Sequence, residues 1–278
     1  MTYRLISSIF CFLLSIPIIA QRNDYTQFRE WSGGIGSMDY MNAAAIPSGL
    51  PGTVYRLEYR SGKISKRNAN RIFEFAARTD YAYMLRRGLS TDLNKPYYHG
   101  EVKLEAICRQ NIPVPIPNFT IDAGLGFSMN ILAGYNPTCT YENLYNEVYP
   151  YGNWFVSPDM HFKINYQANK FIFKGGFNAP LLVAGYFQEY QNKPYDNSVN
   201  NFGSFVKYYI CPNTFAFITD YFRFDGFLSA MYLLKNSDKS QLHIKLTYSY
   251  ESLNSTIHYN SEQKQKQMLS VGLVIRRK

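Results

Sequence analysis

The chain has 278 residues, and its 29 Lys and Arg against 20 Asp and Glu give a formal net charge of +9. This basicity would suit a nucleic acid partner, but no basic patch alternates with exposed aromatic residues on one element, so the sequence predicts no nucleic acid binding. Beyond the first residues, no run of apolar residues is long enough for a transmembrane helix.

Residues 1–20 predict a secretory signal peptide. A short basic start ending at Arg4 precedes the apolar run LISSIFCFLLSIPII and the small residue Ala20, which is the order of a cleaved leader. We therefore expect cleavage before Gln21 and one mature domain over residues 21–278. A membrane anchor is the alternative, but the run is short and no stop-transfer charges follow it closely.

The stretch FTIDAGLGFSMNI, residues 119–131, alternates apolar residues with small or polar ones. A period of two is a strand signal, because successive side chains of a strand point to opposite faces. At about 3.3 Å per residue, the stretch is long enough for a tilted strand that crosses a membrane. Taken alone, it also allows a half-buried strand of a soluble sheet.

The same alternation recurs along the chain, and charges of both signs share the second face. It is found in residues 53–60, 71–86, 101–108, 159–167, 241–251 and 268–276. Closing such a sheet with its apolar face outward would place that face in lipid, let the charges pair inside and leave no unpaired edge. The sequence therefore predicts an all-β fold, a transmembrane antiparallel up-and-down β-barrel.

Counting segments gives about ten strands, with eight or twelve as alternatives because residues 200–236 do not define their strands. The predicted strands lie near 28–36, 53–60, 71–86, 97–109, 119–132, 153–167 and 171–185, then one that ends near 236, then 241–254 and 265–277. An even number would return both termini to the periplasm.

The predicted connections come in two sizes. Short links are expected at 61–70, 111–118, 167–170 and 237–240, and long ones at 37–52, 87–96, 133–152, 187–212 and 255–264. Short turns are typical of the periplasmic rim and long loops of the cell surface. The long segment 136–154 is rich in Tyr, so it could bind a glycan or protein ligand, or simply continue an aromatic girdle.

The charged face allows two interpretations of the interior. A pore lining with Arg and Lys would attract anions, whereas a narrow barrel would be filled by side chains that pair with one another. The inward cations are Arg56, Arg60, Arg78, Lys103, Lys163 and Lys245, and the inward acids are Glu58, Glu74, Asp80, Glu101, Glu105, Asp122 and Asp159. This mixture of signs favours the paired, filled interior.

An enzyme acting on lipid A or phospholipid is the second functional hypothesis. Such chemistry needs a base within hydrogen-bond reach of a nucleophile, and the candidates are His161 with Ser128 inside the barrel and His99 near a rim. Neither GxSxG nor HExxH is present. The preferred hypothesis is a structural or surface-interaction role, and a small pore with a partly cationic lumen is the third.

Cysteine and histidine spacings predict no metal site and no cofactor. Three cysteines follow the leader, Cys108, Cys139 and Cys211. An odd number leaves at least one unpaired. The alternation of its segment makes Cys108 a small apolar residue of the outward face.

Several segments resemble a family of outer-membrane β-barrel proteins from Bacteroidota-type bacteria. They are REWSGGIGSMDYM, TVYRLEYRSG, FIFKGGFNAPLLVAGYFQEY and SVGLVI. The resemblance is one of layout over nearly the whole mature chain. It implies the outer membrane of a Gram-negative bacterium, contact with membrane lipid and insertion by the barrel assembly machinery, and it brings no activity or catalytic residue.

Overall fold

The computed structural model describes residues 26–42, 46–65, 70–85, 96–135, 151–186, 214–257 and 262–277. All regular structure in these segments is β. The strands are β1 (Gln27–Asn42), β2 (Ile46–Ile64), β3 (Arg71–Leu85), β4 (Pro96–Pro113), β5 (Phe119–Tyr135), β6 (Tyr151–Ala168), β7 (Phe171–Pro180), β8 (Leu182–Tyr186), β9 (Thr214–Phe217), β10 (Tyr221–Asn236), β11 (Ser240–Ser255) and β12 (Glu262–Arg277).

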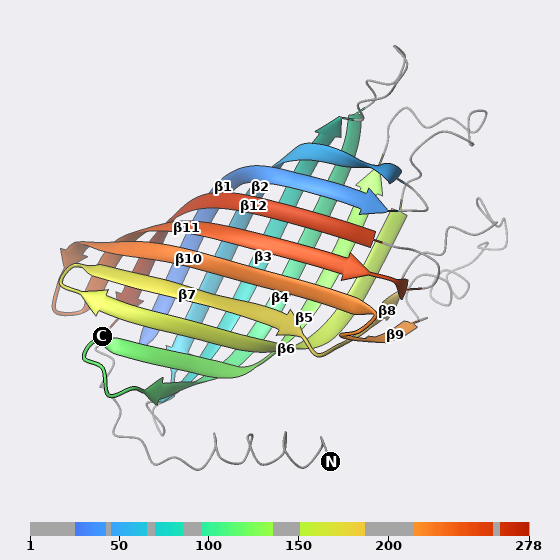
Figure 1. Ribbon diagram of the computed structural model, residues 1–278. Coiled ribbons are helices and arrows are strands. Elements are labelled where there is room, and N and C mark those ends of the chain that lie inside the picture. Colours follow the sequence, from blue (N-terminus) through green and yellow to red (C-terminus); the bar gives the residue numbers. More distant parts are fainter. Residues whose placement is uncertain are drawn as a thin grey trace, which may run out of the picture.

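Ten of these strands close into an antiparallel barrel (Figure 1). Neighbours in sequence pair from β1 to β7, β7 then pairs with β10, and β10, β11 and β12 follow in order. Pairing of β12 with β1 over the full length of both strands closes the ring. The predicted number of barrel strands is confirmed, and closure leaves the ring without an unpaired edge.

The remaining two strands extend the sheet at one rim. Pro180 has no N–H to donate, and β7 ends there; the Leu181 N–H donates to the Pro158 carbonyl at 2.8 Å. The chain then resumes as β8, which pairs with Trp154–Val156 of β6 and with β9. The sequence does not define the strands of residues 200–236. The described part of this region contains one barrel strand, β10, and the short outer strand β9.

One rim of the barrel is made of tight turns. Residues 114–118, 169–170 and 237–239 connect consecutive strands there, and we call this end the short-turn rim. Asn118 and Asn169 have φ of 62° and 51°, a left-handed conformation that Asn adopts more readily than most residues. The short links predicted at these places are confirmed.

At the opposite rim, one predicted connection is wrong. Residues 37–52 were expected to form a long loop, but β1 runs on to Asn42 and β2 begins at Ile46. The inward side chains of this part, among them Met38, Tyr40 and Leu50, are apolar, so the apolar-out, polar-in signal is lost. The predicted long loops 87–96, 133–152 and 187–212 fall mostly outside the described residues. The one predicted at 255–264 is too long, because β11 runs to Ser255 and β12 begins at Glu262.

The outer surface of the barrel is apolar. On β5, Leu125, Phe127, Met129 and Ile131 are 37–54% exposed, whereas Ser128 between them is 1% exposed. Along β12 the burial alternates without a break from Glu262 to Arg277. The predicted assignment of faces is confirmed for these strands, and Cys108 is an exposed free thiol as expected.

Aromatic side chains gather at two heights on this surface. Near the short-turn rim, the Phe171 ring lies 5.0 Å from Tyr232, and near the opposite rim Tyr83 lies 5.6 Å from Tyr98. Phe73 and Tyr83 on β3 are separated by roughly 33 Å along the strand, which a tilt of about 40° projects to about 25 Å, the height of an apolar membrane band. Aromatic girdles at such a spacing fit the two interfaces of a bilayer.

Among the described residues, no helix has the length and apolar character that would let it cross a membrane.

Candidate functional site

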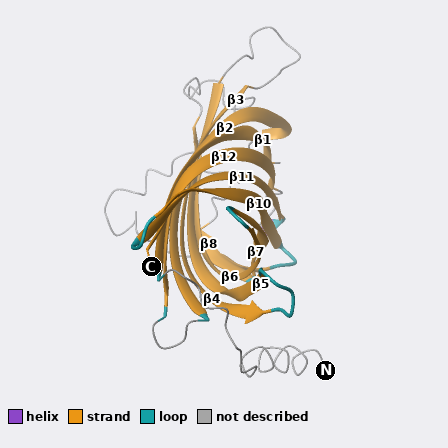
Figure 2. Ribbon diagram, turned by 90° about the vertical axis from the view of Figure 1, so that its left-hand side faces the viewer, coloured by secondary structure: helices purple, strands orange, loops and turns teal. Residues whose placement is uncertain are grey.

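The interior of the barrel has three zones. The first is apolar and lies toward the opposite rim, where it overlaps the second in height: Tyr40 is in register with Lys264, and Met38 with Lys266. We call it the apolar plug. It consists of Met38, Tyr40, Leu50, Val54, Ala82, Met84, Tyr97, Leu132, Phe155, Val183, Ala216, Tyr221, Leu253, Ile257 and Met268, none more than 6% exposed. These side chains come from nearly every strand around the ring and form one buried cluster. Figure 2 shows the strands curving into this ring.

The second zone is an ionic network in the middle of the barrel. Its centre is Glu101 of β4, which is 1% exposed. Carboxylate oxygens of Glu101 lie 2.9 Å from Arg223 Nη2, 3.0 Å from Lys264 Nζ and 3.0 Å from Lys266 Nζ. Because Arg223 belongs to β10 and the two lysines to β12, these contacts span the lumen. Pairs of this kind offset the cost of burying each charge.

Glu251 and Asp80 extend the network around Glu101. Glu251 of β11 lies 2.7 Å from Lys264 and 3.1 Å from Arg78. Arg56 donates two hydrogen bonds to Asp80, at 2.7 and 2.8 Å, the bidentate geometry that makes arginine–carboxylate pairs strong. The predicted pairing of inward charges is therefore found for Arg56, Arg78, Asp80 and Glu101 of this network.

Three carboxylates in this zone are close enough to suggest a metal site, but an ammonium group already lies among them. The ligand atoms of Asp80, Glu101 and Glu251 lie within 4.8 Å of one another. Lys266 Nζ is 2.5 Å from Asp80, 3.0 Å from Glu101 and 3.0 Å from Glu251. The charge that a cation would supply is thus provided by the chain itself.

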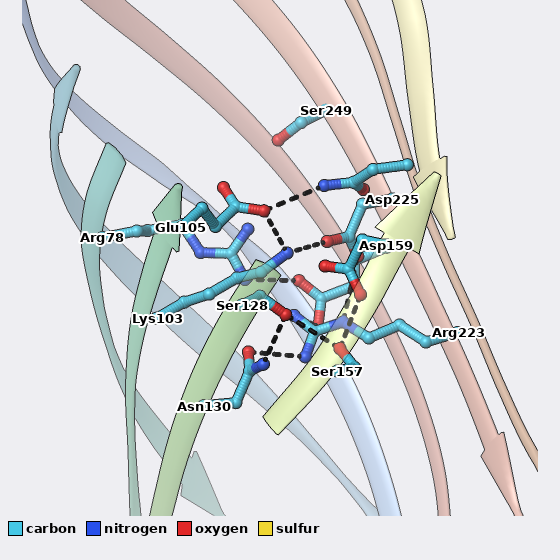
Figure 3. A network of polar contacts seen from close by, with 12 residues as sticks. Arg78, Lys103, Glu105, Ser128, Asn130, Ser157, Asp159, Arg223, Asp225 and Ser249 are labelled. Atoms are coloured by element: carbon cyan, nitrogen blue, oxygen red, sulfur yellow. Dashed lines mark hydrogen bonds and ion pairs between the residues drawn. The ribbon is translucent and has the colours of Figure 1, made fainter. Parts of the chain in front are cut away.

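A chain of hydrogen bonds joins the network to β5 and β6 (Figure 3). The hydroxyl groups of Ser128 and Ser157 are 2.9 Å apart, and the Ser157 hydroxyl donates to Asp159 at 2.5 Å. Asn130 donates to Ser128 at 3.3 Å and accepts from Arg223 at 3.0 Å. The cavity beside these side chains has a volume of about 10 Å³, which leaves no room for a substrate.

The structure does not bring Ser128 and His161 together. Ser128 pairs in register with Ser157, and His161 lies four residues further along β6, on the order of 13 Å away. His161 instead lies near Glu105 and Asp159, whose ligand atoms are within 4.8 Å of a nitrogen of its ring. Glu105 in turn lies 2.8 Å from Lys103 Nζ and accepts from Asn178 at 3.1 Å.

His99 lies on the inward face near the apolar plug. It is 1% exposed, and its ring centroid is 5.3 Å from that of Tyr40. Both residues are enclosed by the barrel. The sequence places His99 near a rim, and β4 does begin close by, at Pro96. The imidazole nevertheless packs inward among other side chains.

The third zone is a cavity of about 370 Å³ that extends from the ionic network to the short-turn rim. Its lining includes the turn residues Asn118, Asn169 and Lys170, and deeper residues such as Ser249 and Asp225. The interior is thus filled at one rim and hollow at the other.

Three of the central charged residues were not singled out from the sequence, Arg223, Lys264 and Lys266. Arg223 lies in residues 200–236, whose strands the sequence does not define, and Lys264 lies in the connection that the sequence predicts at 255–264. A signal was present in the stretch QKQKQ, residues 263–267, since its period of two places both lysines on one face. Both are at most 1% exposed, and Gln263, Gln265 and Gln267 alternate with them on the outer face.

The fold and its surfaces define a class: a transmembrane antiparallel β-barrel with an apolar outer face and an interior that holds an apolar plug, an ionic network and a cavity. Comparison with solved structures finds the Escherichia coli outer membrane protease OmpT at 8% identity, covering 94% of this chain and 99% of that one, with a TM-score of 0.48. The transport unit of the Escherichia coli autotransporter AIDA-I matches at 9% identity, covering 95% of this chain and 94% of that one, also at 0.48.

A third similar structure is the translocator domain of the autotransporter NalP from Neisseria meningitidis. The identity is 9%, the match covers 99% of this chain and 95% of that one, and the TM-score is 0.44. No family model matches the sequence, and no curated protein matches it. At these levels the similarities carry no functional argument, and the fold rests on the strand pairing itself.

Proposed function

We propose that this chain is an outer-membrane β-barrel of a Gram-negative bacterium, exported with a cleaved signal peptide, whose role is structural or lies in surface interaction. The observation that carries the proposal is the interior. An apolar plug of side chains at most 6% exposed and a cross-lumen ionic network occupy the lumen, and a filled lumen is what a narrow barrel of about ten strands allows.

The loops of the opposite rim are the proposed working part. The aromatic-rich segment 136–154 supports binding of a glycan or protein ligand at the cell surface, although residues 136–150 lie outside the described part of the chain. Affiliation with Bacteroidota-type barrels, and insertion by the barrel assembly machinery, are part of the same proposal and rest on the resemblance of sequence layout.

The two other hypotheses have less support. A lipid-cleaving enzyme would need space beside its nucleophile, whereas Ser128 adjoins a cavity of about 10 Å³ and pairs with Ser157. A pore would need a path past the plug. The structural or interactive role needs neither.

Conductance in planar bilayers tests the filled lumen. We expect the folded protein to show no steady current, because ions would have to cross the apolar plug. A matched variant carries Phe155→Ala and Tyr221→Ala, which removes two plug rings whose centroids are 5.2 Å apart. It should conduct more than the parent. Steady anion-selective current through the parent would contradict the proposal.

Orientation is tested with two cysteines at opposite ends of one strand. Thr256 and Asp238 flank β11 and are both exposed. In a variant without Cys108, Cys139 and Cys211, Thr256→Cys should react with a membrane-impermeant thiol reagent on intact cells. Asp238→Cys should react only after the outer membrane is opened. The reverse pattern would place the short-turn rim at the cell surface.

A further inference from the structure

The cavity at the short-turn rim has two walls of different charge. The wall formed by β1–β5 carries five carboxylates and four guanidinium groups, which sum to a formal charge of −1. The wall formed by β6, β7, β10, β11 and β12 with their turns has five Lys and Arg side chains and one carboxylate, a formal charge of +4. The five cations are Lys163, Lys170, Lys174, Lys245 and Arg276.

The carboxylates of the first wall are already paired or hydrogen-bonded. Arg60 Nη2 lies 2.6 Å from Glu58, and Arg109 forms an ion pair with Glu74. Asp122 accepts hydrogen bonds from the amides of Asn111 at 2.8 Å and Asn165 at 3.0 Å. Glu58 and Glu74 are therefore neutralised by arginines of their own wall, whereas Asp122 keeps its charge and is the cross-strand partner of Lys163.

Lys174 of the second wall is not balanced in the same way. Lys245 lies 2.6 Å from Glu30, and Lys163 lies over the Phe227 ring at 5.8 Å and is in register with Asp122. Lys174 forms no ion pair or hydrogen bond with any described residue. The charged groups that act on Lys174 are Arg276, Lys163 and Lys245, together with Glu30, which Lys245 already engages. Like charges gathered in a partly enclosed space repel one another unless an anion joins them.

A histidine at the same place is short of a partner. His243 is 2% exposed and lines the cavity, and its Nδ1 forms no hydrogen bond with the described residues. Lys174 and Arg276 are the charged groups that act on it. A buried polar atom without a partner costs free energy, so a hydrogen-bonding ligand in the cavity would satisfy it.

We propose that this cavity binds phosphate, either free or as a small soluble phosphate monoester, through Lys174, Lys163, Arg276 and His243. A dianion offsets the unpaired Lys174 ammonium group and the positive charge gathered around it, and a guanidinium binds phosphate oxygens in a bidentate manner. On the same wall, Ile172 and Val274 belong to one apolar cluster with Met231, which offers a surface for the carbon part of an ester. The ligand enters from the short-turn rim.

Calorimetric titration of the folded barrel in detergent micelles tests this inference. Inorganic phosphate and glycerol phosphate are added separately at constant ionic strength, with chloride as the reference anion. The parent should bind phosphate, and Lys174→Gln should weaken binding at least about tenfold because one charge-assisted contact is lost. Lys239→Gln is the matched control: Lys239 is exposed in the 237–239 turn of the same rim and does not line the cavity. Its affinity should equal that of the parent.

Thermal unfolding supplies a second readout that a purely structural lysine would not give. Without phosphate, Lys174→Gln should unfold at a higher temperature than the parent, because one repelling charge is gone. With phosphate, the parent should gain stability by ligand binding and Lys174→Gln should gain little. If phosphate binds to parent, Lys174→Gln and Lys239→Gln alike, or to none of them, the proposed site is wrong. Preference for the ester over free phosphate would identify the organic part as a contact.

Discussion

Leu125→Arg is expected to destabilise the folded barrel by roughly 2–4 kcal/mol, because a guanidinium near the middle of a lipid-facing strand has no partner in hydrocarbon. Leu125 is 39% exposed on the outer face and lies near the centre of β5. Urea unfolding in lipid vesicles, followed by the fluorescence of Trp31 and Trp154, measures the free energy of unfolding for each variant.

Two control variants separate charge from other effects. Leu125→Ala removes the side chain without adding charge, so it should cost much less than Leu125→Arg. Thr120→Arg adds the same charge on the inward face. Thr120 lines the cavity, and the Asn165 amide donates hydrogen bonds to both Thr120 and Asp122. Its cost should stay within about 1 kcal/mol. If Leu125→Arg folds as stably as the parent and Thr120→Arg does not insert, the outer face does not meet lipid.

The strands and their faces could be predicted because they depend on local alternation. Leu269, Val271 and Leu273 are 49–53% exposed, and Ser270 is 6% exposed, as the period of two requires. The same rule places Glu101 and Lys103 inside. Closure of the sheet into a barrel could be predicted as well, because hydrocarbon does not tolerate the unpaired backbone groups of an open sheet edge.

The apolar plug could not be predicted by that rule. Where the lumen is apolar, both faces of a strand are apolar and the alternation disappears. A segment such as GLPG at 49–52, which contains Gly and Pro, then looks like a loop. Leu50 and Val54 are both fully buried on the inward face. A sequence pattern built on contrast between faces fails wherever that contrast is absent.

Pairings across the lumen are also beyond sequence reasoning. Lys103 and Asp225 are far apart in the chain and belong to strands that are not neighbours in the barrel, β4 and β10, yet their charged atoms are 2.9 Å apart. Such a contact depends on barrel diameter, strand stagger and side-chain length together. The sequence could predict that inward charges pair, but not which ones, and it could not show that Lys174 would be left without a carboxylate.

Glu101→Gln is expected to be the most destabilising change inside the barrel, at roughly 3–5 kcal/mol, because it leaves several buried cations without their shared counter-charge. Glu101 is within 3.3 Å of Arg78 as well as 3.0 Å or less of Arg223, Lys264 and Lys266. Glu58→Gln is the matched control. Glu58 is 13% exposed, pairs with one arginine among the described residues and lines the cavity, so its loss should cost about 1 kcal/mol or less.

A double variant then asks whether the loss is one of charge balance or of packing. Lys264 is fully buried and contacts both Glu101 and Glu251. If uncompensated charge is the cause, Lys264→Met should destabilise the parent but recover part of the stability of Glu101→Gln, because it removes one of the excess cations. Urea unfolding in vesicles gives the coupling free energy from the four proteins of the cycle. Additive losses would show that Glu101 acts through packing alone, whereas recovery would show that the network holds the centre of the barrel together by its balance of charge.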